Sequence, residues 1–99
     1  MMQYKMKLDP FPVLLKLKFM HGLIDENALG TTDIDNGDVL VKVSIDDNDK
    51  VAPTIIHESV HVVQFLQQLI NTQFDIETQA YMVERVACWA IDKYYHSLK

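Results

Sequence analysis

The chain has 99 residues, of which 48% are hydrophobic and 23% charged, a composition that predicts one folded domain over 1–99 and excludes a disordered chain. Its 9 basic and 14 acidic residues give a formal charge of -5, which argues against a nucleic-acid partner and against an anionic membrane surface. No apolar run approaches the roughly 20 residues needed to cross a bilayer. The single cysteine, Cys88, permits no internal disulfide, so a reducing, cytoplasmic location is expected.

The first half of the chain, residues 1–50, is expected to contain short strands and loops. Alternation of apolar and polar residues predicts three strands, which lie around Tyr4, Met6 and Leu8, over residues 13–19, and over residues 39–45. Residues 30–38 are rich in Asp, Asn and Gly, which favour turns, and are predicted to form a loop. The strand over 39–45 is expected at the sheet edge, where an extended peptide could add as a further strand.

The second half, residues 53–97, is predicted to form two long helices, because no Gly or Pro follows Pro53 and the pattern is interrupted only near residues 71–75. Pro53 suits a first helical position, and Asp75 is a reasonable N-cap for the second helix. The acidic residues Asp46, Asp47 and Asp49 are expected in a solvated turn that favours the N-terminus of the first helix. The expected fold is therefore α+β, with about three N-terminal strands followed by two packed helices.

The first of these helices carries the motif H-E-x-x-H, as His57-Glu58-Ser59-Val60-His61. Residues four apart lie on one face of a helix, so His57 and His61 can direct two imidazole nitrogens at one metal ion. Glu58 lies about 100° round the helix, where it can reach a metal-bound water without binding the metal. With four His and four Glu in the chain, the motif is expected by chance only about 0.006 times. It predicts half of a zinc site.

The remainder of this helix gives a second indication. His57, His61, Gln64 and Gln68 form one narrow polar stripe on an otherwise apolar circumference, which predicts a buried helix. Buried imidazoles need partners, because an unpaired buried polar group costs about 1–3 kcal/mol. The partner is a metal ion or, if these are two ordinary core histidines, backbone groups and glutamine side chains.

A catalytic zinc site needs a third protein ligand and an open position for water, and the second helix offers Glu77 and Glu84 on one stripe. An antiparallel helical hairpin that turns near residues 72–73 places Glu84 level with His61, whereas an earlier turn favours Glu77. Geometry alone leaves both open. Cys88, one turn beyond Glu84, could bind zinc as a thiolate but is expected to be a small buried hydrophobic residue.

The HESVH motif, followed by Glu77-Thr78-Gln79-Ala80-Tyr81, resembles the gluzincin metallopeptidases, in which H-E-x-x-H on one helix is completed by a Glu on the next. The E-x-x-A-Y block is similar to the third-ligand block of the CAAX-prenyl and heat-shock membrane peptidases, and the two blocks together are similar to small phage-encoded zincin-like proteins. The resemblance covers roughly residues 54–90.

This resemblance implies a minimal zincin-like fold in which His57, His61 and Glu77 bind Zn²⁺ and Glu58 is the general base. It also implies a peptide or protein substrate in the cytoplasm, which would be the host cytoplasm if the protein is phage-encoded. The chain departs from the larger families, since no residue matches the Tyr, His or Arg that usually stabilises the oxyanion.

Two functions therefore compete. The first is that of a zinc-dependent metallopeptidase, in which a zinc-bound water attacks a peptide carbonyl with Glu58 as general base. The alternative is a non-catalytic, zinc-stabilised interaction module, which could equally be phage-encoded, in which Cys88 or Glu84 fills the water position.

Overall fold

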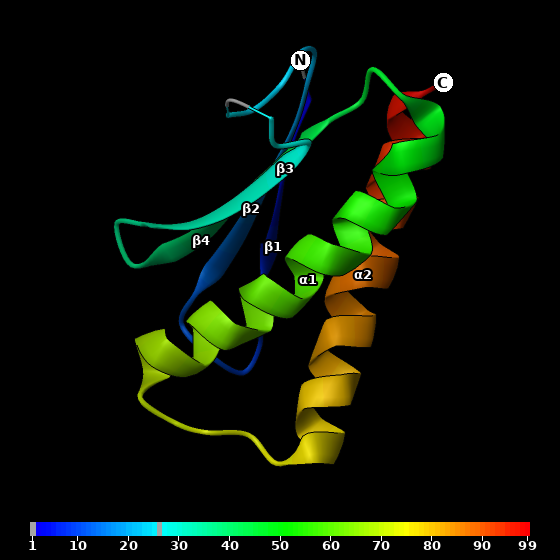
Figure 1. Ribbon diagram of the computed structural model, residues 1–99. Coiled ribbons are helices and arrows are strands. Elements are labelled where there is room, and N and C mark those ends of the chain that lie inside the picture. Colours follow the sequence, from blue (N-terminus) through cyan, green and yellow to red (C-terminus); the bar gives the residue numbers. More distant parts are fainter. Residues whose placement is uncertain (1, 26) are drawn as a thin grey trace.

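The computed structural model describes residues 2–25 and 27–99, and it places a sheet in the first half of the chain and two helices in the second (Figure 1). The elements are β1 (Met2–Lys7), β2 (Leu14–Met20), β3 (Gly30–Asp35), β4 (Asp38–Ser44), α1 (Asn48–Ile70) and α2 (Ile76–Ser97). The α+β class expected from the sequence is confirmed.

The sheet has the strand order β1-β2-β4-β3, with β2 and β4 parallel at its centre and β1 and β3 antiparallel to them at its edges. Alternate residues of the two central strands point to one face, which is the period-two pattern of the sequence. They are buried beneath the helices and are Leu15, Leu17 and Phe19 of β2 with Val39, Val41 and Val43 of β4.

Residues Gly30–Asp35 form a strand, so the loop predicted over 30–38 is wrong, and the sheet has four strands instead of three. The turn-favouring residues Asn36 and Gly37 have positive φ of 53° and 82° and make the tight turn of a hairpin between β3 and β4. Before that turn, the β-branched Thr31, Thr32 and Ile34 occupy extended positions that suit them. The turn-favouring residues Asn36 and Gly37 therefore indicate where strand β3 ends, and they do not indicate a loop over the whole of 30–38.

This extra strand moves the edge of the sheet. The strand expected over 39–45 is β4, which pairs on one side with β2 and on the other with β3. It is consequently interior, and its predicted role as the edge strand is wrong. The free edge beside the helices belongs to β3.

Helix α1 begins at Asn48, with Pro53 inside the helix and not at its first position. The Asp47 carboxylate accepts a hydrogen bond from the Asp49 N–H at 3.1 Å and so caps the helix before the proline is reached. Asp47 thus favours the helix N-terminus as expected.

Helix α2 begins as predicted. Asp75 is its N-cap and accepts a hydrogen bond from the Thr78 N–H at 2.7 Å. Hydrogen bonds from the Thr78 side chain and then from its backbone lower the pKa of Asp75. The predicted interruption also holds, because α1 ends at Asn71 with a left-handed φ of 52°.

Both helices pack on the same face of the sheet. The start of α1 and the end of α2 are close, since the Tyr94 hydroxyl donates to Asn48 Oδ1 at 3.1 Å, and the Tyr94 ring packs against Phe19 of β2. Figure 1 shows that the helices diverge from there toward the connection that joins them. They therefore form a V and not a close antiparallel hairpin, which matters for every site between them.

Candidate functional site

The glutamate of the H-E-x-x-H motif is buried between α1 and the edge strand β3. Glu58 is 6% exposed, and its Oε1 accepts a hydrogen bond from Thr32 Oγ1 at 2.7 Å. Gly30 makes this close approach possible, because a Cβ at that position would lie 2.5 Å from Thr54 Cγ2 and 3.1 Å from Glu58 Cγ. The strand thus holds the carboxylate at a defined place on the sheet edge.

The two histidines of the motif lie side by side on α1. The ring centroids of His57 and His61 are 5.0 Å apart, with the ring planes at 75°. Two imidazoles that share one tetrahedral Zn²⁺ at Zn–N distances of about 2.0–2.1 Å also have centroids about 5 Å apart. The spacing of this pair therefore fits a shared ion.

Gln64 orients one of the rings. His61 Nδ1 lies 2.9 Å from Gln64 Oε1. A carboxamide oxygen only accepts hydrogen bonds, so in the neutral tautomer that carries its proton on Nδ1 the ring donates to Gln64 and Nε2 has the lone pair. An imidazole held in this way through its other nitrogen is the usual arrangement of a metal-binding histidine.

The expectation that α1 is buried all round is wrong. Ile56 and Val60 are 50% and 41% exposed, and His57 is exposed as well. The sheet covers one side of α1 and α2 covers another, so the histidines face away from the core. Burial therefore does not require a partner for them, and the case for a metal depends on the geometry of the pair.

A third ligand is not assembled with this pair. Within residues 2–25 and 27–99, no three His, Cys, Asp or Glu side chains form a group that could hold a metal ion. Glu77 is an exposed residue of the first turn of α2, and Glu84 is exposed further along that helix. The start of α2 diverges from α1 toward the connection that joins them (Figure 1).

Cys88 differs from its prediction, since it is exposed and not a buried hydrophobic residue. The buried residues of α2 are Met82, Val86, Ala90 and Tyr94. Cys88 lies about 160° round the helix from Ala90, because each residue advances about 100°. It therefore shares the outward stripe with Glu77 and Glu84, as the sequence indicated, but that stripe is on the surface.

A cleft of about 330 Å³ opens beside His57 and Glu58, between the first turns of α1 and the segment that leads into β3. Leu29 and Gly30 line its strand side, and Thr54 lines its helix side. Gly30 and Thr32 are not among the predicted site residues, because the turn-favouring composition of 30–38 predicts a loop there. The Asn36-Gly37 turn, followed by the alternation in β4, was the signal that could have revealed this strand.

No helix formed by the described residues is both long and apolar enough to cross a membrane. Comparison of the chain with protein-family models, with curated proteins and with solved structures gives no match. The similarity to gluzincin peptidases accordingly depends on the motif residues themselves, His57, Glu58, His61 and Glu77.

Proposed function

We propose that this protein is a zinc-dependent metallopeptidase in which His57 and His61 bind Zn²⁺ and Glu58 is the general base. The observation that carries the proposal is the pair of imidazoles, with centroids 5.0 Å apart, together with the buried carboxylate of Glu58, which lines a cleft with His57. When bound, the metal supplies Lewis acidity toward a peptide carbonyl and toward a water molecule.

The two oxygens of Glu58 have different surroundings. Oε1 accepts the hydrogen bond from Thr32, whereas no described residue donates a hydrogen bond to Oε2, which lies toward Gly30. Oε2 is thus the oxygen free to take a proton from the attacking water. Thr32 is a positioning residue, because it fixes the carboxylate without itself reaching the reacting atoms.

The substrate would bind as an extended peptide along β3. This strand pairs with β4 on one side only, so its other side is open to pairing, and its helix-facing residues Gly30 and Thr32 lie against Thr54 and Glu58 of α1. An added strand there would carry its peptide carbonyls past Glu58, with main-chain hydrogen bonds giving most of the affinity.

Glu77 is proposed as the third ligand, supported by the E-x-x-A-Y resemblance. For this its carboxylate must reach the ion that His57 and His61 would hold. Glu84 is the alternative ligand. Zinc titration of Glu77→Gln and of Glu84→Gln shows which glutamate binds the metal. Loss of a carboxylate that binds the metal directly should weaken zinc affinity by more than the roughly 10- to 100-fold that is typical for residues that only hydrogen-bond to a ligand.

One observation favours the second candidate, a non-catalytic interaction module. An open groove of about 630 Å³ runs along the outer face of the helices and is lined mainly by apolar residues, including Ile56, Val83 and Ile91. Such an apolar surface suits a protein partner.

Zinc content and turnover decide between the two. We expect about one zinc per chain in wild type and in Glu58→Gln, and none in His57→Ala/His61→Ala, by elemental analysis of protein purified without chelator. His96→Ala, which removes an exposed histidine of the last turn of α2, is the matched control and should keep its zinc.

Turnover is measured on a broad peptide library read by mass spectrometry. Wild type should cleave, and Glu58→Gln should be slower by several orders of magnitude, because the amide keeps the shape of the side chain but cannot accept the proton. Zinc in both proteins with cleavage by neither would favour the interaction module. Zinc retained by the double histidine variant would exclude the assigned site.

A further inference from the structure

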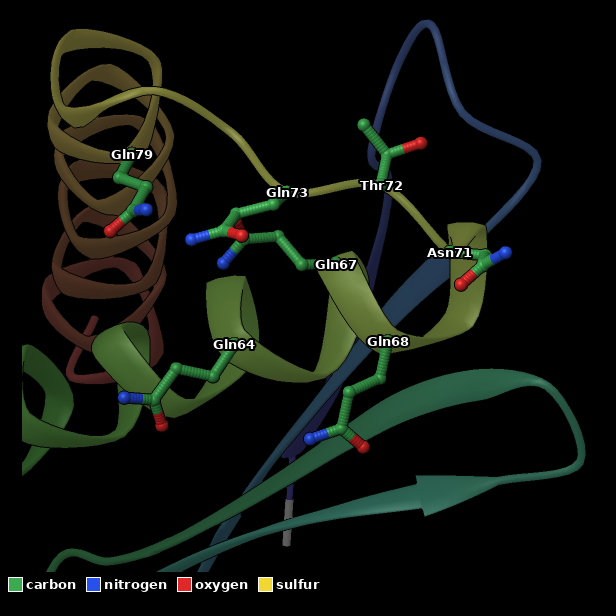
Figure 2. Close-up of a pocket in the computed structure, with 7 residues that line it drawn as sticks. All are labelled: Gln64, Gln67, Gln68, Asn71, Thr72, Gln73 and Gln79. Atoms are coloured by element: carbon green, nitrogen blue, oxygen red, sulfur yellow. The ribbon is translucent and has the colours of Figure 1, made fainter.

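The connection between the two helices borders an open pocket of about 560 Å³ with an unusual lining (Figure 2). Five of the six glutamines of the chain line it, namely Gln64, Gln67, Gln68, Gln73 and Gln79. Asn71 and Thr72 complete the lining, which includes no charged and no aromatic side chain. A surface with this composition offers hydrogen-bond donors and acceptors but no net charge.

Two of these glutamines build the wall of the pocket. Gln67 Oε1 accepts from the Phe74 N–H at 2.6 Å, and Gln79 Nε2 donates to the Phe74 carbonyl at 3.0 Å. The Phe74 ring is buried and packs against Phe11, with centroids 5.5 Å apart. Because both backbone groups and the ring of Phe74 are held, the connection spans the open end of the V in a defined conformation.

Other carboxamides remain available. The side chains of Gln68, Asn71 and Gln73 form no hydrogen bond with any described residue, and all three are exposed. Figure 2 shows Gln64 and Gln68 extending from the same side of α1. Gln68 thereby continues the stripe that His57, His61 and Gln64 begin, so the pocket lies along the helix from the proposed metal site.

This chemistry selects a class of ligand. A carboxamide presents an N–H donor and a C=O acceptor together, which is the pattern of a peptide group or of an Asn or Gln side chain. An ion would find no opposite charge in the lining, and a sugar ring would find no aromatic surface on which to stack. An uncharged stretch of polypeptide satisfies the lining best.

We propose that this amide pocket binds an extended, uncharged polypeptide stretch, with Gln68 and Gln73 hydrogen-bonding to its peptide groups or amide side chains. The inference rests on the proposed function in one respect, which is that the polypeptide is the substrate cleaved beside Glu58. Binding itself is independent of cleavage and can be measured without it.

The test uses a displayed random peptide library selected on zinc-loaded Glu58→Gln protein, which retains the pocket. Enriched peptides should be rich in uncharged polar residues. Their Kd, measured by fluorescence anisotropy, should rise about tenfold when Gln68→Ala/Gln73→Ala is added, because two hydrogen bonds are lost. Gln3→Ala is the matched control, since Gln3 is exposed on β1 and is the one glutamine outside the pocket. Equal affinities in all three proteins, or no enrichment of any peptide, would overturn the inference.

Two further outcomes separate the pocket from the proposed function. Peptides that bind through Gln68 and Gln73 but are not cleaved by wild type would leave the pocket established and count against the peptidase. Cleavage by wild type at rates unchanged by Gln68→Ala/Gln73→Ala would leave the peptidase standing and overturn the pocket. If a glycan bound through these glutamines and no peptide did, the proposal that the ligand is a polypeptide would be overturned.

Discussion

On the sheet side of α1, Ile55 is 2% exposed and Glu58 is held by Thr32, whereas on the outer side Ile56 is 50% exposed and His57 is open to solvent. These are neighbouring residues in the sequence. A step of about 100° round the helix takes the side chain from a closely packed environment to an open one.

The difference shows how one helix can serve two needs. A general base must be held in a fixed position, and the close approach of β3 at Gly30 provides this for Glu58. A metal-binding pair must be reachable by its ion and by a ligand, and the outer side leaves His57 accessible. We therefore expect substitutions on the sheet side to change stability, and substitutions on the outer side to change binding.

The largest effect is expected from paired substitutions of adjacent isoleucines. Ile55→Ala should lower the free energy of unfolding by about 2–5 kcal/mol, because it leaves a cavity in the core. Ile56→Ala, on the outer side, should change it by no more than about 0.5 kcal/mol. Urea denaturation of both variants checks the comparison, and similar losses would show that the two sides of α1 are not packed differently.

The contact at Gly30 can be tested with a double-mutant cycle. Gly30→Ala should cost about 1–3 kcal/mol of stability, since the new methyl group would overlap Thr54 Cγ2. Thr54→Ala removes that atom, so the double variant should lose less than the two single variants together. Strictly additive losses would mean that the strand and the helix do not meet at this point.

A smaller loss of stability, about 1 kcal/mol, is expected for Thr32→Val, which keeps the shape of the side chain but removes the hydrogen bond to Glu58. Thr32→Ser retains the hydroxyl and is the control. If the proposed function is correct, peptide cleavage should fall in the valine variant and persist in the serine variant. Equal stability of the two variants would show that the hydroxyl does not hold the carboxylate.

The smallest change in stability is expected on the outer side. Gln64→Ala should alter the free energy of unfolding by no more than about 0.5 kcal/mol, because Gln64 is exposed. Its zinc affinity should nevertheless weaken by about 10- to 100-fold, since His61 loses the partner that orients its ring. Competition with a chromophoric chelator measures this, and Gln68→Ala, whose side chain does not contact His61, should bind zinc normally.

The sequence by itself determined the features that depend on neighbouring residues. The α+β class, the existence of strands β2 and β4, the N-cap at Asp75 and the adjacency of His57 with His61 follow from hydrophobic periodicity, capping and the helical repeat. Each of these needs only residues a few positions apart, so each could be predicted without knowledge of the fold.

Only the tertiary structure decided what surrounds those features. The strand Gly30–Asp35 exists because β4 offers it a partner, and its position at the sheet edge buries Glu58 while His57 remains exposed. The exposure of Cys88, and the absence of a third metal-binding side chain beside the histidines among the described residues, follow likewise from how α2 crosses α1. Strand order and helix crossing depend on packing between residues far apart in the chain, which no local pattern records.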